Sequence, residues 1–293
     1  MDTNHYKDDM NQPILLCTDL DRTVLPNGAE PESQLARPLF RALSEAGLVC
    51  LVYVSGRDIN LLQQAVAEYG IPVPDYAIGD VGSTIFKVEG AEWRPWLEWQ
   101  DAIAPDWNGY QQADLKHLLT DIEILRLQEA EKQHEYKLSY YTAADIDRTS
   151  LLAIVGERLE QRGVKASLIW SIDEAAGLGL FDILPRSASK LGAIRFLMQK
   201  TGFTAQQTLF AGDSGNDLPV LVSELNSVLV RNAHADVRDE VLLSLADNQR
   251  LSIYMAKGNF LGMNGNYAAG VLEGLAHFHP SANAWLEQAA ASL

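Results

Sequence analysis

The stretch "ILLCTDLDRTVLPNG", Ile14 to Gly28, decides how we interpret the rest of the chain. It begins as an apolar strand and ends in two acids, Asp19 and Asp21, which are followed by Thr23 and a turn. Each carboxylate makes the other harder to ionise, so a strand gains no stability from ending in such a pair. We therefore expect a cation, or chemistry that needs both carboxylates, at this strand end.

Apolar strands and amphipathic helices alternate around this stretch. We expect strands at 14–19, 48–56 and 75–80, helices at 31–46 and 58–69, and the same alternation again from residue 190, ending in a core helix at 266–278. Continuous apolar strands of this kind are typical of parallel sheets covered by helices on both faces. The pattern predicts an α/β fold with a doubly wound parallel sheet.

Residues 87–186 have a different texture. A polar stretch at 113–133 reads as a helix, and the order strand, helix, strand, strand follows it. We expect a smaller α+β cap at 87–186 inserted into a core made of 13–86 and 187–293, behind a disordered tail at 1–12. The four tryptophans near the start of this region either stack on a sugar or pack a hinge or core: Trp93, Trp96, Trp99 and Trp107.

Composition limits the classes of partner. The chain has 293 residues, 47% of them hydrophobic, and 39 Asp and Glu against 23 Lys and Arg give a net charge of −16. Nucleic acid and anionic membranes bind basic surfaces, so we expect neither as a partner. No apolar run is long enough to span a membrane and no signal-peptide pattern is present, so we expect a cytoplasmic protein. Cys17 and Cys50 lie in apolar strands, and we expect buried free thiols.

Ligands of open parallel sheets bind at the carboxyl ends of the strands. Those ends carry Asp19 and Asp21, then Ser55, Gly56 and Arg57, and then Asp213, Ser214, Asn216 and Asp217. Four carboxylates in one crevice repel each other by several kcal/mol even at an effective dielectric constant of about 20. A divalent cation removes this repulsion, and an oxygen-only donor set suits Mg²⁺ better than Zn²⁺. We expect Asp213 to ligate the ion directly.

A phosphate group would explain the remaining polar residues. Ser55 and the free backbone N–H groups after it form an anion site, and Lys190, at a helix start, would neutralise a phosphate that the acids repel. Alone, a D-x-D pair is often a turn and a lysine is most often a surface residue. The ordered occurrence of all these groups at strand ends or helix starts of one fold is what indicates phosphate chemistry.

The ordered set resembles the motifs of the haloacid dehalogenase (HAD) superfamily of phosphotransferases: "DLDRT", "SGR", Lys190 and "GDSGND", with the cap between the second and third motifs as in Cof-like phosphatases. "DVGSTIF", "DILPRSASK", "SVLVRNA" and "AAGVLEGLAHF" are further similar to segments of sucrose-phosphate phosphatases. Arg22 departs from this pattern, because family members more often carry Gly or Asn there. This departure casts little doubt on the implied chemistry, and the role of Arg22 itself stays open.

The resemblance implies a role for each site residue. Asp19 would attack phosphorus and form an aspartyl phosphate, while Asp21 would protonate the leaving oxygen and then deprotonate water. Mg²⁺ would be held by Asp19, the backbone carbonyl of Asp21, Asp213 and Asp217. Ser55, Gly56, Lys190 and Asn216 would hold the phosphate, with Thr23, Arg57 and Ser214 in support.

The implied substrate is sucrose 6-phosphate, hydrolysed to sucrose and phosphate. Several alternatives stay open: a phosphatase of mannosylfructose phosphate, glucosylglycerol phosphate or a hexose phosphate, a phosphomutase, or a non-catalytic sugar-phosphate-binding partner of the synthase that makes the substrate. Association of an active enzyme with that synthase is a further expectation. The cap carries the weaker resemblance, and within it Lys137 either points at the substrate or is an exposed strand lysine.

Overall fold

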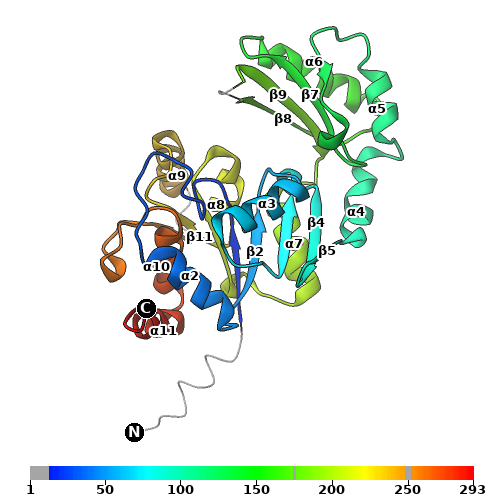
Figure 1. Ribbon diagram of the computed structural model, residues 1–293. Coiled ribbons are helices and arrows are strands. Elements are labelled where there is room, and N and C mark those ends of the chain that lie inside the picture. Colours follow the sequence, from blue (N-terminus) through cyan, green and yellow to red (C-terminus); the bar gives the residue numbers. More distant parts are fainter. Residues whose placement is uncertain (1–12, 174–175, 248–251) are drawn as a thin grey trace.

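The computed structural model of the chain describes residues 13–173, 176–247 and 252–293 (Figure 1). The tail at 1–12, expected to be disordered, lies outside the described residues. A large α/β core carries a smaller α+β cap, which confirms the predicted fold class. Among the described helices, none has the length and apolar character needed to cross a bilayer.

The core is built on one eight-stranded sheet in the order β12-β11-β10-β1-β2-β3-β4-β5. Its strands are β1 (Ile14–Thr18), β2 (Val49–Val54), β3 (Tyr76–Gly79), β4 (Thr84–Glu89), β5 (Glu92–Pro95), β10 (Thr208–Gly212), β11 (Asn226–Leu229) and β12 (Ile253–Met255). Neighbours from β12 to β3 are parallel, and β4 and β5 extend the sheet in antiparallel fashion. The strand that ends in the two acids therefore lies near the middle of the sheet.

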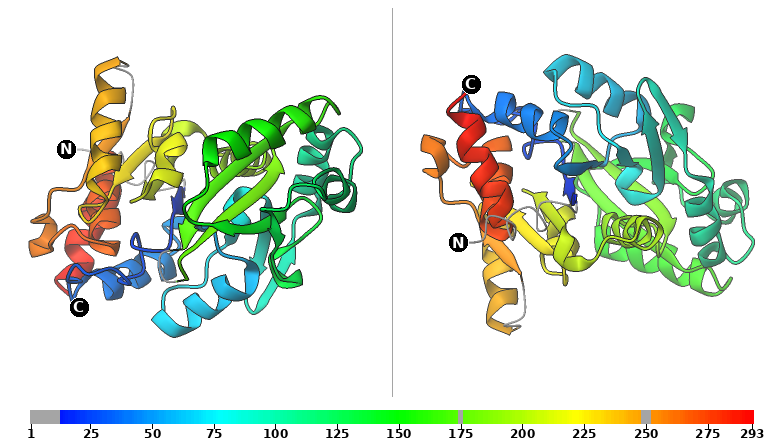
Figure 2. Two further views of the ribbon diagram at one scale, coloured as in Figure 1. Left: turned by 90° about the horizontal axis from the view of Figure 1, so that it is seen from above. Right: turned by 90° about the horizontal axis from the view of Figure 1, so that it is seen from below.

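Helices cover both faces of this sheet. One face packs against α2 (Ala36–Glu45), α3 (Ile59–Tyr69), α10 (Ala268–Phe278) and α11 (Pro280–Ala290), and the other against α4 (Leu97–Ile103), α7 (Lys190–Thr201), α8 (Leu218–Leu221) and α9 (Ala235–Asp247). Successive residues of a strand point to opposite faces, so Leu16 joins the first core and Leu15 the second. Figure 2 shows α11, at the end of the chain, beside α2 near its beginning.

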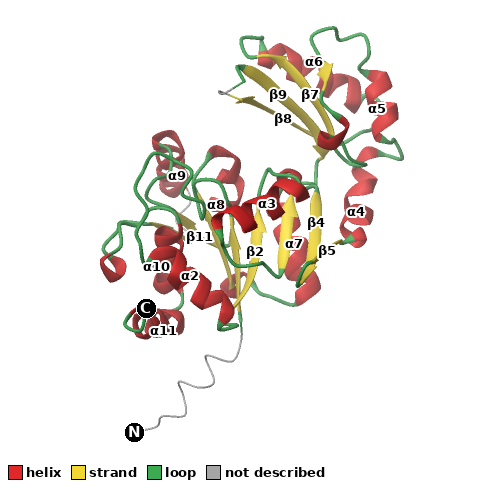
Figure 3. Cartoon of the chain, viewed as in Figure 1, coloured by secondary structure: helices red, strands yellow, loops and turns green. Residues whose placement is uncertain are grey.

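The cap is an antiparallel sheet in the order β6-β7-β9-β8, with helices packed on one side of it (Figure 3). Its elements are α5 (Gln112–Leu118), β6 (Arg126–Leu127), β7 (Leu138–Ala143), α6 (Arg148–Glu160), β8 (Ala166–Asp173) and β9 (Leu178–Pro185). The prediction of one continuous helix over 113–133 is wrong, because α5 ends at Leu118. The hydroxyl of Thr120 donates to the carbonyls of Lys116 and His117, which competes with continuation of the helix.

The expected start of the cap at residue 87 is also corrected. β4 and β5 form a hairpin that pairs with β3, so residues up to 95 belong to the core sheet. The hairpin turns at Gly90, whose φ of 62° suits glycine. Trp96 and Trp99 then pack against Phe196 in the core, and Trp107 is fully buried inside the cap. These tryptophans therefore pack in cores, and Trp93 lies partly buried against the other face of the sheet.

The last predicted core helix is confirmed as α10. Its residues at helical spacing all pack into one core: Ala268, Val271, Leu272, Leu275 and Phe278. Gly270 and Gly274 let the helix approach the sheet, because a Cβ at Gly274 would lie 2.1 Å from a methyl carbon of Val228. Close packing of α10 against β11 therefore depends on the absence of a side chain here.

Gly274→Ala should destabilise the fold although alanine is the better helix former. Helix propensity favours alanine by about 1 kcal/mol, but overpacking against Val228 costs about 1–3 kcal/mol. The control is Gly156→Ala in α6, where the nearest atom to a new Cβ lies 3.6 Å away and a gain in stability is expected. Urea unfolding measures the change in the free energy of unfolding for both variants. An increase for Gly274→Ala would contradict the close packing of α10 against β11.

Candidate active site

The carboxyl ends of β1, β2 and β10 meet at one edge of the sheet, because Thr18 pairs in parallel register with both Tyr53 and Ala211. The residues that follow these strands surround a cavity of about 320 Å³. Its lining consists of Asp19, Asp21, Arg22, Ser55, Gly56, Arg57, Leu61, Asp213, Ser214 and Asn216. Three segments far apart in the sequence are thus brought to one site.

Three buried carboxylates form the centre of this site. One oxygen each from Asp19, Asp213 and Asp217 lies within 4.8 Å of the others. Lys190, at the first position of α7, donates from Nζ to Asp19 Oδ1 at 2.8 Å, to Asp217 Oδ1 at 2.7 Å and to Asn216 Oδ1 at 3.1 Å. Its three N–H donors are all used, so this lysine offsets part of the negative charge of the three acids.

The acids remain short of positive charge. Burial, together with the neighbouring Asp217 and Asp213, raises the pKa of Asp19 to about 8 although Lys190 acts against this. Burial and Asp217 likewise raise the pKa of Asp213 to about 6. Buried oxygen donors that resist ionisation for lack of a cation fit a hard divalent ion such as Mg²⁺. Asp19 and Asp213 also line the cavity, so both could bind such an ion.

Asp217 has a different setting from the other two acids. It does not line the cavity, and its Oδ2 accepts from the backbone N–H groups of Asp213 and Ser214 and from the Ser214 hydroxyl. Gly212 allows this, because a Cβ there would lie 2.6 Å from the Asp217 carboxyl carbon. The "GDSGND" loop is therefore folded around Asp217, which orders the loop that presents Asp213.

Asp21 is held by an arginine that we expected only in a supporting role. Arg57 donates to both carboxylate oxygens of Asp21, at 2.6 and 2.8 Å, and Asn27 adds a third hydrogen bond. Burial opposes ionisation, but these hydrogen bonds outweigh it and lower the pKa of Asp21. In this conformation Asp21 is the ionised acid and Asp19 the one that resists ionisation, which is the reverse of the order expected from the resemblance. The difference has two causes: burial beside Asp217 raises the pKa of Asp19, and the hydrogen bonds from Arg57 lower the pKa of Asp21.

Arg22 and Thr23 both contact the candidate metal ligand Asp213. Arg22 Nε lies 3.2 Å from Asp213 Oδ2, and the Thr23 hydroxyl donates to Oδ1 at 3.2 Å. Arg22, whose role the sequence left open, is therefore part of the site. Its φ of 60° is left-handed, a conformation that Gly and Asn adopt more easily than arginine does. Nothing in the local sequence pattern indicated that this side chain reaches residue 213.

The structure places Ser55 at the cavity and Lys137 away from it. Ser55 is buried, its hydroxyl accepts from the N–H of Arg57, and Gly56 beside it lines the cavity. Lys137 is not brought to the cavity. It is buried at the junction of cap and core and contacts Asp80, which sequence reasoning did not single out.

This architecture defines the class of the protein. A doubly wound core that places D-x-D, a serine, a lysine and a paired-acid loop at one sheet edge, beneath an α+β cap, is the HAD phosphatase arrangement. The chain superposes on the sucrose-phosphatase of Synechocystis sp. PCC6803, solved in complex with sucrose and phosphate, with a TM-score of 0.69 at 28% identity, covering 91% of this chain and 98% of that one. It is a phosphoric monoester hydrolase.

The particular family follows from a match to its sequence model. Residues 12–279 match the sucrose-6F-phosphate phosphohydrolase family, and the chain belongs to it. It is 52% identical to an HAD-like hydrolase of Nitrosococcus oceani over 278 residues, 95% of this chain and 75% of that protein. It is 28% identical to the mannosylfructose-phosphate phosphatase of Agrobacterium fabrum, over 90% of this chain and 96% of that protein.

Asp213→Asn should weaken a stabilisation by Mg²⁺ that we expect for the unaltered chain. A ligand at 100 times its Kd stabilises the folded state by about 2.7 kcal/mol, which thermal unfolding with and without MgCl₂ measures. The stabilisation of the unaltered chain by Mg²⁺ should be smaller at pH 6 than at pH 8. Asp19 and Asp213 have raised pKa values and must lose protons before they bind the ion.

The control for this measurement is Asp101→Asn, which removes an exposed carboxylate from α4. It should keep the full Mg²⁺-dependent shift. Equal shifts in Asp213→Asn and the unaltered chain would contradict a metal site at Asp213.

Proposed function

We propose that the protein hydrolyses a sugar phosphate in a Mg²⁺-dependent reaction, with sucrose 6-phosphate as the first candidate substrate. The observation that carries this proposal is the buried cluster of Asp19, Asp213 and Lys190 beside a cavity of about 320 Å³. Family membership supports the sugar-phosphate class, since the Synechocystis relative was solved with sucrose and phosphate. A binding protein would need no such combination of acids.

Asp19 is the proposed nucleophile. One of its oxygens forms a bond to phosphorus as the bond from phosphorus to the sugar oxygen breaks, giving an aspartyl phosphate and the free sugar. Water then attacks the aspartyl phosphate and releases inorganic phosphate. Mg²⁺ held by Asp19, Asp213 and the Asp21 carbonyl would offset the negative charge of the phosphoryl group and favour the ionised form of Asp19.

Asp21 is the proposed proton carrier. It gives a proton to the leaving sugar oxygen and then takes one from the attacking water. Since Arg57 stabilises the ionised form of Asp21, the acid step requires this contact to loosen when substrate enters. The Arg57 guanidinium is then free to donate to phosphate oxygens beside Ser55 and Gly56, because all three line the same cavity.

The identity of the sugar is the finer part of the proposal. The second candidate is mannosylfructose phosphate, favoured by a relative of similar length that is named for that substrate. Glucosylglycerol phosphate and hexose phosphates stay as alternatives for the same chemistry, as does a phosphomutase. Association with the synthase and a cytoplasmic location remain predictions from the sequence.

Asp19→Asn should abolish phosphate release. The amide is a poor nucleophile, and loss of the attacking group should lower kcat by at least about 10³-fold. The assay measures phosphate release from sucrose 6-phosphate, mannosylfructose phosphate, glucosylglycerol phosphate and glucose 6-phosphate, each with Mg²⁺ and with EDTA. Asp101→Asn, at an exposed position, is the matched control and should keep full activity. Full turnover by Asp19→Asn would rule out the covalent mechanism, and full turnover in EDTA would rule out the role of the metal.

Arg57→Leu should move the alkaline limb of the pH profile to higher pH. Arg57 lowers the pKa of Asp21, so its removal raises that pKa and keeps the acid protonated over a wider range. The profile of kcat/KM for the best substrate, from pH 5 to pH 9, measures this shift even if Arg57→Leu lowers the overall rate. A limb that stays in place or moves to lower pH would contradict the role of Asp21 as the acid.

A further inference from the structure

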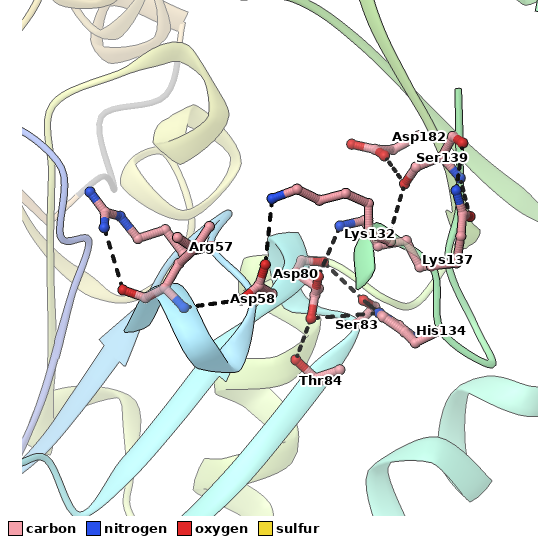
Figure 4. Close-up of polar contacts among 12 residues, drawn as sticks. Arg57, Asp58, Asp80, Ser83, Thr84, Lys132, His134, Lys137, Ser139 and Asp182 are labelled. Atoms are coloured by element: carbon pink, nitrogen blue, oxygen red, sulfur yellow. Dashed lines mark hydrogen bonds and ion pairs between the residues drawn. The ribbon is translucent and has the colours of Figure 1, made fainter. Parts of the chain in front are cut away.

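A second cluster of charged side chains lies where the cap meets the core (Figure 4). Lys137, directly before β7 of the cap, donates from Nζ to Asp80 Oδ1 of the core at 2.8 Å. Both residues are buried, at 6% and 5% exposure. A weaker pair joins Lys132 of the cap to Asp58 of the core at 3.5 Å. Both pairs join the cap segment 132–137 to the core.

The surroundings of Lys137 leave it little freedom to bind a phosphate instead. Asp182, on cap strand β9, accepts from Ser139 and lies on the cap side of the lysine (Figure 4). His134 is neutral, because burial lowers its pKa to about 4, and it shares a hydrogen bond of 3.0 Å with the Ser83 hydroxyl. Lys137 is therefore the cation that balances Asp80, and its charge also acts on the neighbouring Asp182.

Asp80 stands in a strained turn that connects directly to the catalytic edge. Asp80 and Val81 have φ values of 49° and 60°, which are unfavourable for residues with a Cβ and most of all for a β-branched one. The turn is fixed by backbone hydrogen bonds, from the Asp80 N–H to the Arg57 carbonyl at 2.9 Å and from the Val81 N–H to the Ser55 carbonyl at 3.2 Å. The strained turn thus holds the backbone that carries the candidate phosphate site.

The same turn also contacts the helix that carries the catalytic lysine. Gly82 packs so closely on the start of α7 that a Cβ would lie 2.2 Å from the carbonyl carbon of Ser189 and 2.5 Å from the backbone nitrogen of Lys190. The indole of Trp99 donates to the Gly82 carbonyl at 3.0 Å. One short turn therefore joins the Ser55 loop, the start of α7 and, through Asp80, the cap.

We propose that the buried Asp80–Lys137 ion pair fixes the cap in the position needed for turnover of a sugar phosphate, with Asp80 as the positioning residue on the core side. The inference rests on the proposed function, since a substrate senses the pair only if its sugar reaches the cap. A small aryl phosphate needs only the edge of the core sheet. Loss of the pair should therefore slow hydrolysis of the sugar phosphate and leave hydrolysis of the aryl phosphate almost unchanged.

The test compares Asp80→Asn, Lys137→Met and the double variant on the sugar phosphate that the unaltered protein hydrolyses best and on p-nitrophenyl phosphate. Each single change leaves a buried charge without its partner and displaces the cap, so kcat/KM for the sugar ester should fall roughly 10- to 100-fold. The loss should lie mainly in KM, because a cap that is less often in place lowers apparent affinity. kcat/KM for p-nitrophenyl phosphate should stay within about twofold.

The double variant decides whether the two residues act together. Its loss on the sugar ester should be no greater than the larger single loss, since the Asp80–Lys137 pair is absent from all three variants. Lys116→Met, at an exposed position of α5, is the matched control and should match the unaltered protein on both esters. Additive single losses would overturn the proposal, as expected if Lys137 touched the sugar directly. Equal losses on both esters would also overturn it, since they would indicate damage to the catalytic edge.

Hydrogen exchange provides a readout that does not depend on turnover. In Asp80→Asn the backbone amides of residues 132–139 should exchange faster than in the unaltered protein, while those of β1 and β10 should not change. Lys137→Met serves as the second variant if Asp80→Asn does not fold. If the unaltered protein hydrolyses no sugar phosphate, the proposed function fails, and unchanged exchange at 132–139 would separately overturn the cap contact.

Discussion

The site depends on the burial of one lysine among acids. Lys190 enters the site at the start of α7 and donates to Asp19, Asp217 and Asn216, which come from two different strand ends. Burial alone would lower its pKa, but the two carboxylates outweigh this and raise it, so the lysine stays charged. Without this cation the acids could not be packed so closely, and with it alone they still lack charge. The site is therefore built to receive further positive charge and a phosphoryl group.

The two halves of the catalytic edge are stabilised in different ways. Asp217 is buried and orders its own loop through backbone N–H groups, so Asp213 is presented by a rigid support. Asp21 is more exposed and is held by a flexible arginine side chain. A rigidly presented candidate metal ligand beside a more mobile acid fits the roles proposed for them, because the ion must keep its place while the proton carrier serves two successive steps. The cap adds a third element, joined to the edge through Asp80.

Much of the fold could be predicted from the sequence because the signals are local. Alternate residues of the apolar strand β1 pack into two different cores. The apolar residues of α10 recur at helical spacing and pack into one of these cores. The errors arose where local pattern and long-range pairing disagree. The sequence of the hairpin β4–β5 resembles the start of a new domain, but β4 pairs with β3. The helical composition of 113–133 produces a helix only as far as Leu118.

The sequence by itself determined the chemical groups of the site and their order, because strand ends of a parallel sheet must meet at one edge. Only the tertiary structure decided which charge partners which: Arg57 with Asp21, Arg22 with Asp213, and Lys137 with Asp80. Which partner a long, flexible side chain meets depends on the path of the whole chain. The two members of the Arg22–Asp213 pair lie 191 residues apart in the sequence, and those of the Lys137–Asp80 pair lie 57 apart. Electrostatic energy depends on these distances and on burial, and neither is encoded in local spacing.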